Sequence, residues 1–150
     1  MGWTELPRKL PLLGRMGWQD RWLLLQVTVL LGLFRALILT VPFPRLARHF
    51  GQHRVESPQA AELADLRQAR RIGWAIRTVS PYTPWTSNCF PQALTAKYLL
   101  NRRGIVSTLY FGANFKAPGA MAAHAWLRCG PLFVTGGPGH LSFGTTAYFS

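Results

Sequence analysis

The chain has 150 residues, and its 17 Lys and Arg against 5 Asp and Glu give a formal net charge of +12. This length suits one domain, and a content of 49% hydrophobic and 13% aromatic residues excludes a disordered basic tail. All the acids lie before residue 66, which excludes paired-carboxylate hydrolysis and carboxylate-bound Mg²⁺ in residues 66–150. The 2 cysteines are too few for a disulfide framework and form no C-x-x-C pair, so we expect no metal site.

Residues 1–20 form a basic lead-in without a signal-peptide pattern, which predicts a cytoplasmic protein. The apolar segment 22–41 that follows is long enough to span a bilayer. However, Arg35 lies well inside it, and the seven-residue spacing of Arg21, Thr28 and Arg35 gives a polar stripe on a helix. The segment is therefore predicted to pack on the domain or on a partner, with membrane association as the less favoured alternative.

Two further helices are predicted before the pattern changes. The first runs from Ser57, a capping residue followed by proline, to about Val79. The second runs from Cys89 to Arg103, where Gly104 ends it.

Residues 105–111 are β-branched, aromatic and alternating, which is typical of a strand, whereas the last fifteen residues are Gly-rich and weakly patterned. The predicted elements are a strand at 105–111, a loop at 112–119, a hairpin of 122–128 with 132–135, and a closing strand at 145–149. Helices followed by a small antiparallel sheet predict an α+β fold. Residues 1–56 are the lead-in and apolar helix of this domain, and residues 57–150 are its core.

Cys89 is the candidate nucleophile, because it lies where the chain enters a predicted helix. Unpaired backbone N–H groups and the helix dipole favour a thiolate at such a position. A free cysteine is also a common small buried residue, so the position alone leaves a structural role open.

His124 is the candidate general base, since it lies in mid-strand between the small residues Ala123 and Ala125. It follows Cys89 with a strand and a loop between them, and this spacing allows the strand to lie against the cysteine's helix. A lone strand histidine is more often structural. His140 is a competitor, but its Gly-rich segment is expected to hold an imidazole poorly.

Several motifs taken together resemble one protein family. They are Pro84-Trp85, Cys89-Phe90-Pro91-Gln92-Ala93-Leu94, Leu99-Leu100, Arg102-Arg103-Gly104, Ala123-His124-Ala125-Trp126-Leu127 and Val41-Pro42-Phe43-Pro44-Arg45-Leu46-Ala47. The combined pattern is similar to the transglutaminase-like core of lasso-peptide biosynthesis B proteins. More narrowly, it resembles the stand-alone B2 leader peptidase, which implies a papain/transglutaminase-like fold.

The resemblance implies a cysteine protease that removes the leader from a ribosomally made precursor peptide. Cys89 would be the nucleophile and His124 the general base, with Trp85, Gln92 and Trp126 as walls of the substrate pocket. The implied partners are a B1-type leader-binding protein and an asparagine-synthetase-like cyclase. The family needs no cofactor of its own, whereas the cyclase uses ATP.

One departure from the family pattern concerns the group that orients His124. The family usually supplies an Asp after the histidine strand, but this chain has Val134-Thr135-Gly136-Gly137 there. Thr135, a backbone carbonyl or a partner protein are the alternatives. Loss of an orienting acid in a catalytic triad can cost a factor of about 10⁴ in rate, so the protein is expected to be slow alone or dependent on its partners.

Three alternatives remain at this point. An Arg-rich stretch from Arg67 to Arg77 and the high charge would suit nucleic acid, although no nucleic-acid-binding motif is present. Segment 22–41 would suit a membrane-associated protein that is not an enzyme. The same Cys–His pair would also serve acyl transfer to an amine instead of water.

Overall fold

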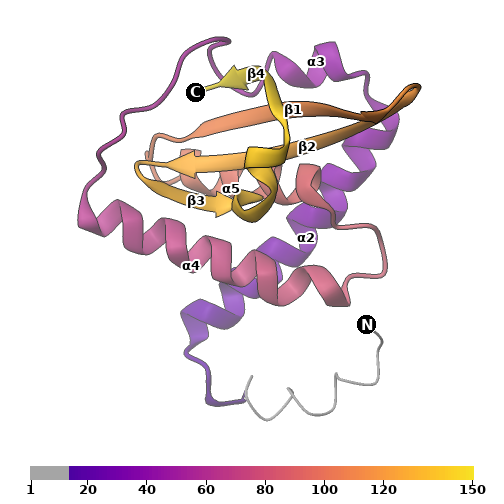
Figure 1. The fold of residues 1–150 in the computed structure, drawn as a ribbon. Coiled ribbons are helices and arrows are strands. Elements are labelled where there is room, and N and C mark those ends of the chain that lie inside the picture. Colours follow the sequence, from indigo (N-terminus) through magenta and orange to yellow (C-terminus); the bar gives the residue numbers. More distant parts are fainter. Residues whose placement is uncertain (1–13) are drawn as a thin grey trace.

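The computed structural model describes residues 14–150, except for the side chains of residues 116 and 117. Helices come first along the chain and strands follow (Figure 1). The helices are α2 (Trp18–Thr40), α3 (Phe43–Ala47), α4 (Leu63–Val79) and α5 (Cys89–Asn101), with a 3-10 helix, η2 (Ser80–Tyr82), before α5. The strands are β1 (Thr108–Ala117), β2 (Ala120–Cys129), β3 (Leu132–Thr135) and β4 (Gly144–Phe149), and a second 3-10 helix, η3 (Gly137–Ser142), precedes β4.

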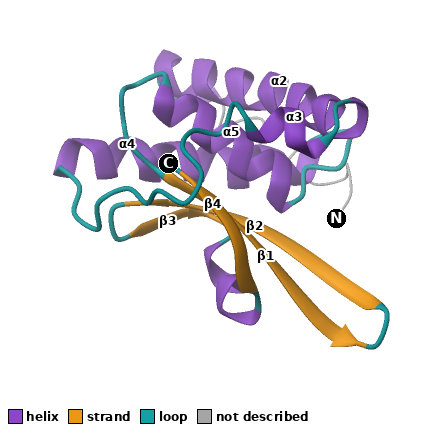
Figure 2. Ribbon diagram, turned by 90° about the horizontal axis from the view of Figure 1, so that it is seen from above, coloured by secondary structure: helices purple, strands orange, loops and turns teal. Residues whose placement is uncertain are grey.

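The four strands form one antiparallel sheet in the order β3-β2-β1-β4. Helices α4 and α5 pack on this sheet, and α2 packs on α4 and α5. Figure 2 shows the helices on one side of the sheet and η3 on the other. The arrangement confirms the predicted α+β class, with helices first and a small antiparallel sheet after them.

Period-two alternation divides the side chains of β2 between the two faces of the sheet. Ala125, Leu127 and Cys129 are buried in the core between the sheet and the helices. His124 and Trp126 point toward the other face, where η3 lies. The fold therefore puts the candidate base on the sheet face opposite the helices.

Helix α2 buries one apolar face and exposes another. Leu23, Leu24, Val27 and Leu31 are buried, at the spacing of one side of a helix. By length and composition α2 could cross a membrane, since an 18-residue window has a mean hydropathy of 2.1 and only 22% of that window is buried. The helix reaches Thr40, and Pro42 then begins a turn into α3.

The prediction that a helix starts at Ser57 is wrong, because α4 begins at Leu63. Ser57 is bonded to the sheet instead of capping a helix: its backbone N–H donates to Oγ1 of Thr108 at 2.7 Å. Its carbonyl accepts a hydrogen bond from the buried Arg128 at 2.9 Å. These long-range contacts hold residue 57 against the sheet, outside any helix. The local sequence cannot predict them, because the bonded residues are far apart in the chain.

The predicted strand at 105–111 and loop at 112–119 also need correction. β1 begins at Thr108 and continues to Ala117, pairing with β2 as far as Ala120. The turn of this hairpin is short and contains Gly119 at φ +83. Residues 105–107 follow the end of α5, where the carbonyl of Ser107 accepts a hydrogen bond from the Lys97 ammonium group. The closing strand near residues 145–149 is confirmed as β4.

Candidate active site

Cys89 is the first residue of α5, and Asn88 is its N-cap. Its side chain is half-buried and packs against the hydrophobic core between the helices and the sheet. The backbone N–H groups of Cys89 and Phe90 have no acceptor within the helix, because the first turn has no preceding turn to bond to. A negative charge that develops beside Cys89 would therefore meet free donors and the positive end of the helix dipole.

His124 is held on β2 by one polar contact and two aromatic contacts. Its Nε2 lies 2.8 Å from the carbonyl oxygen of Gly136. Its ring stacks on Phe143 with centroids 5.0 Å apart and on Trp126 at 5.7 Å. Because a carbonyl only accepts, Nε2 must carry the hydrogen in this bond, and Nδ1 of the neutral ring then keeps its lone pair. The structure thus fixes the tautomer in which Nδ1 can accept a proton.

The polar partner of His124 is the carbonyl of Gly136 and not an acid. Among the three alternatives from the sequence, it corresponds to the backbone carbonyl. The hydroxyl of Thr135 is buried and has no hydrogen-bond partner among the described residues, so it does not orient His124. Gly136 adopts φ +69, a left-handed conformation that favours glycine and turns the chain out of β3 toward η3.

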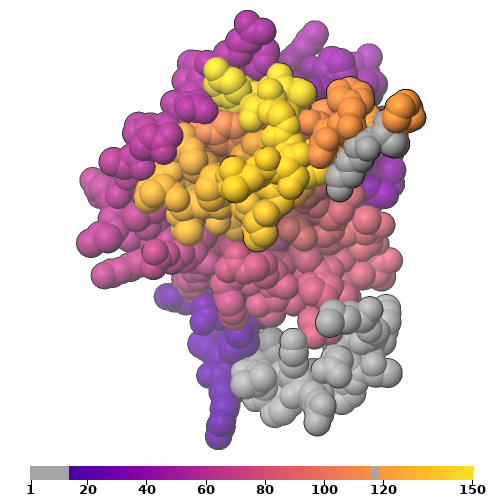
Figure 3. Space-filling view, in the orientation of Figure 1, coloured from indigo at the N-terminus to yellow at the C-terminus, as the bar shows by residue number. Residues whose placement is uncertain are grey.

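The structure places Cys89 and His124 on different sides of the sheet. Within residues 14–150 no hydrogen bond joins the Cys89 thiol to the His124 imidazole. Cys89 packs with the core on the helix side of the sheet, and His124 lies with η3 on the other side. Figure 3 shows the C-terminal segment, in yellow, covering that second side. Catalytic geometry would therefore require a local rearrangement.

A groove of about 610 Å³ is lined by residues near Cys89 and near His124, although neither of the two lines it. It runs along β3, and its lining includes Gln92 of α5 and Arg77 of α4 as well as residues 136–138. Gln92 lies one turn after Cys89, and Gly136 is the residue that binds His124. β3 pairs with β2 only as far as Leu127, so no strand covers the edge of β2 beside His124.

Of the remaining residues predicted for the pocket, one lines the groove and two do not. Gln92 lines the groove, and its amide donates to the carbonyl of Ser87 at 2.8 Å. Trp85 packs on α2, where a Cβ on Gly32 would come within 2.8 Å of its ring. Trp126 is buried and stacks on Tyr110 with ring centroids 5.5 Å apart. Neither tryptophan lines the groove.

His140 is held more firmly than the sequence suggested. It lies in η3, where Nδ1 contacts the carbonyl oxygen of Gly137, and its ring stacks on Phe133 with centroids 4.2 Å apart. Trp126 lies 6.1 Å away, ring centre to ring centre. η3 was missed because its residues are rich in glycine and lack a hydrophobic period.

Sequence reasoning also missed the polar network that supports this face of the sheet. Arg128 is 5% exposed and donates to the carbonyls of Ser57 and Gly130 and to the hydroxyl of Tyr110. The Tyr110 hydroxyl in turn donates to Glu56 at 2.8 Å. The network fixes Tyr110, on which Trp126 stacks, and Trp126 supports the ring of His124.

Comparison with known proteins identifies one family. A family model described as the Transglutaminase-like superfamily matches residues 37–147, from the end of α2 into β4, which include both Cys89 and His124. No curated protein and no solved structure matches the chain.

Proposed function

Because this chain belongs to the transglutaminase-like superfamily, we propose that it is a cysteine peptidase that cleaves the leader from a lasso-peptide precursor. The superfamily includes cysteine proteases, which supports the peptidase class. The lasso-peptide substrate rests on the combined motifs around Cys89 and His124. The observation that carries the proposal is the tautomer of His124, since its bond to Gly136 leaves Nδ1 able to take a proton.

The proposed reaction has two steps. In the first, Sγ of Cys89 attacks the scissile carbonyl carbon, its thiol proton passes to Nδ1 of His124, and the C–N bond breaks as that proton moves to the leaving amine. The leader is then held on Cys89 as a thioester, and the core peptide leaves with a free N-terminus. In the second, water attacks the thioester and gives one proton to Nδ1, the C–S bond breaks, and the imidazolium returns that proton to the leaving thiolate of Cys89. The leader leaves as a carboxylate.

The oxyanion of each step would lie at the start of α5. Pro91 has no backbone N–H, so the donors available in the first turn are those of Cys89 and Phe90. These donors are fixed by the helix, which packs through Leu94 and other buried residues on the sheet. Preorganised donors of this kind are commonly worth about 10²–10³ in rate.

The proposal requires Cys89 and His124 to approach each other when substrate binds. Hydrogen bonds between catalytic groups often form only in the substrate complex, so their absence in the free protein does not exclude the pair. The groove along β3 is the natural place for the change. A peptide seated there would contact Gln92 on the Cys89 side and Gly136 on the His124 side.

The partners proposed are a precursor peptide, a B1-type leader-binding protein and an asparagine-synthetase-like cyclase that uses ATP. The protein itself would need no cofactor. A positive net charge of +12 supports an acidic peptide or partner. Dependence on a partner also accounts for a site whose two reacting groups are apart in the free chain.

The test is mass spectrometry of the precursor peptide encoded beside this protein, incubated with and without the leader-binding partner. We expect one cut, abolished by Cys89→Ala and by His124→Ala and retained by Cys129→Ala. The His140→Ala variant distinguishes the two histidines: loss of cleavage in that variant, with His124→Ala still active, would reassign the base. Cleavage that survives Cys89→Ala would overturn the proposal.

A further inference from the structure

We propose that the exposed face of α2 docks this protein on the surface of an anionic lipid bilayer. The face consists of Trp18, Trp22, Leu25, Val29 and Leu33, here called the apolar stripe. This inference does not depend on the reaction proposed above.

The apolar stripe is continuous along one side of the helix. Its members are three or four positions apart, which places them in one row about 22 Å long. They are 76%, 50%, 52%, 60% and 49% exposed, in chain order. Monomeric soluble proteins seldom expose such a contiguous apolar surface, and it usually marks a site of interaction with a protein or a membrane.

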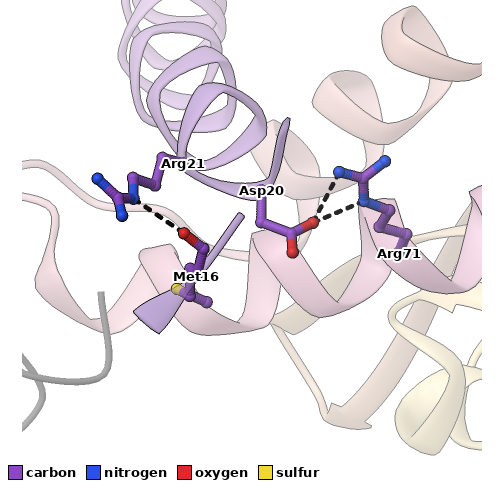
Figure 4. A network of polar contacts seen from close by, with 4 residues as sticks. All are labelled: Met16, Asp20, Arg21 and Arg71. Atoms are coloured by element: carbon purple, nitrogen blue, oxygen red, sulfur yellow. Dashed lines mark hydrogen bonds and ion pairs between the residues drawn. The ribbon is translucent and has the colours of Figure 1, made fainter. Parts of the chain in front are cut away.

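A cluster of arginines borders the N-terminal end of the stripe. Arg71 and Arg103 line one hollow of about 220 Å³ together with Trp18 and Trp22. Burial, and then the charges of Arg71 and Arg102, lower the pKa of Arg103, so three guanidinium groups act on one another here. Asp20 neutralises only Arg71, at 2.7 Å (Figure 4). Arg102 and Arg103 have no carboxylate partner in the described part of the chain.

This combination matches the chemistry of a lipid interface. An apolar helix face with cations beside it can enter the acyl boundary while its arginines contact lipid phosphates. Trp18 and Trp22 stack on each other with centroids 6.5 Å apart, at one end of the stripe, and tryptophan is enriched at the headgroup level of membranes. The stripe has no hydrogen-bonding side chain except the tryptophan N–H groups, so it offers little to specify a protein partner.

The helix would lie on the bilayer and not cross it. The side opposite the stripe carries Leu23, Val27 and Leu31, which are 3%, 0% and 0% exposed and belong to the core. Arg71 also ties the start of α2 to α4 through Asp20. Insertion of α2 across a membrane would separate it from this core, whereas docking of the stripe leaves the fold intact.

The test is flotation of the full chain with vesicles of phosphatidylcholine, with and without phosphatidylglycerol. Wild type should float with the anionic vesicles, remain unbound with phosphatidylcholine alone, and lose binding as salt is raised. Val29→Gln and Arg102→Gln should each lower the bound fraction, Val29→Gln by roughly tenfold in affinity. The matched controls are Leu141→Gln, at a leucine 88% exposed on η3, and Arg54→Gln, at an exposed arginine beside β4.

The variants change exposed side chains, and equal thermal midpoints would show that all of them fold. The proposal is overturned if wild type fails to float with anionic vesicles, or if the controls reduce flotation as much as Val29→Gln and Arg102→Gln. It is likewise overturned if the stripe is covered by a second copy, seen as a concentration-dependent dimer that Val29→Gln dissociates and that does not float.

Discussion

Nε2 of His124 donates a hydrogen bond to the carbonyl oxygen of Gly136, 2.8 Å away. A carbonyl cannot titrate, so the bond selects one tautomer of the neutral imidazole without placing a full negative charge beside it. The imidazolium formed during catalysis would be stabilised less than by a carboxylate. The contact therefore supplies orientation and only part of the electrostatic support that an aspartate gives.

The Gly136→Ala substitution should both destabilise the fold and lower cleavage. A Cβ there would lie 2.5 Å from the carbonyl oxygen of Ala125 and 3.1 Å from Nε2 of His124, and φ is +69. We expect a loss of about 2–4 kcal/mol, because the left-handed backbone cost adds to a steric clash. Denaturant unfolding measures the loss in the free energy of unfolding. The rate of precursor cleavage measures the effect of displacing His124.

The matched control is Gly104→Ala, which has nearly the same φ of +70 but nothing within 4 Å of the new Cβ. It should lose only the backbone term, about 1 kcal/mol, and should cleave normally. Equal losses of stability and activity in the two variants would show that the surroundings of Gly136 do not matter.

The two thiols should differ sharply in reactivity toward iodoacetamide. Cys129 is fully buried, and burial together with the charge of Asp65 raises the pKa of its thiol. Cys89 is half-buried at a helix start. Since alkylation needs an accessible thiolate, native protein should gain one label, on Cys89, as peptide mass mapping would show. A label on Cys129 first would contradict the described core.

The folded protein should become more stable as pH rises from 8 to 10.5, in part because of Lys97. Burial lowers the pKa of this ammonium group from 10.5 to about 8. Between these values the unfolded state binds more protons than the folded state, so raising the pH favours folding. The contribution reaches about 2–3 kcal/mol. Below pH 8 both states are protonated and the full cost of the buried charge is present.

The Lys97→Met variant should lack this rise. It retains a long apolar side chain but leaves the carbonyl of Ser107 without its donor, at a cost of about 1 kcal/mol. Stability measured by denaturant unfolding across pH 7 to pH 11 compares the two proteins. Parallel curves would mean that Lys97 does not titrate as its burial implies.

Much of the fold followed from the sequence because its signals were local. Proline and glycine mark the ends of α2 and α5, and alternation marks the first part of β1. The start of α4 was misplaced because Ser57 contacts Thr108 and Arg128, residues distant in sequence. Local propensities do not predict hydrogen bonds between distant residues. The capping rule therefore wrongly predicted that Ser57 starts a helix.

The candidate site was predictable only in its residue types. Cys89 at a helix start and His124 in a strand were identified from position, and both positions are confirmed. The sequence did not predict that Cys89 and His124 lie on different sides of the sheet, because the face that His124 occupies depends on the register of β2 with β1. The carbonyl of Gly136 could be named only as a class, because a backbone atom has no sequence signature.

Arg128 should prove the most important structural side chain on the η3 face. Arg128→Met would leave the carbonyls of Ser57 and Gly130 and the hydroxyl of Tyr110 without their donor. We expect a loss of about 3 kcal/mol, since several buried acceptors become unsatisfied together. Arg54→Met, at an exposed position, should change the unfolding midpoint little. A small effect of Arg128→Met would show that residues 57–62 are held by other contacts.

The central claim is that Cys89 forms a covalent bond with the leader during cleavage. The most direct measurement is the intact mass of the protein after acid quenching of a reaction with precursor peptide and leader-binding partner. The account predicts a species heavier by the leader less one water, mapped to Cys89, present in Cys129→Ala and absent in Cys89→Ala. Cleavage of the precursor by the Cys89→Ala variant, or an adduct on another residue, would contradict it.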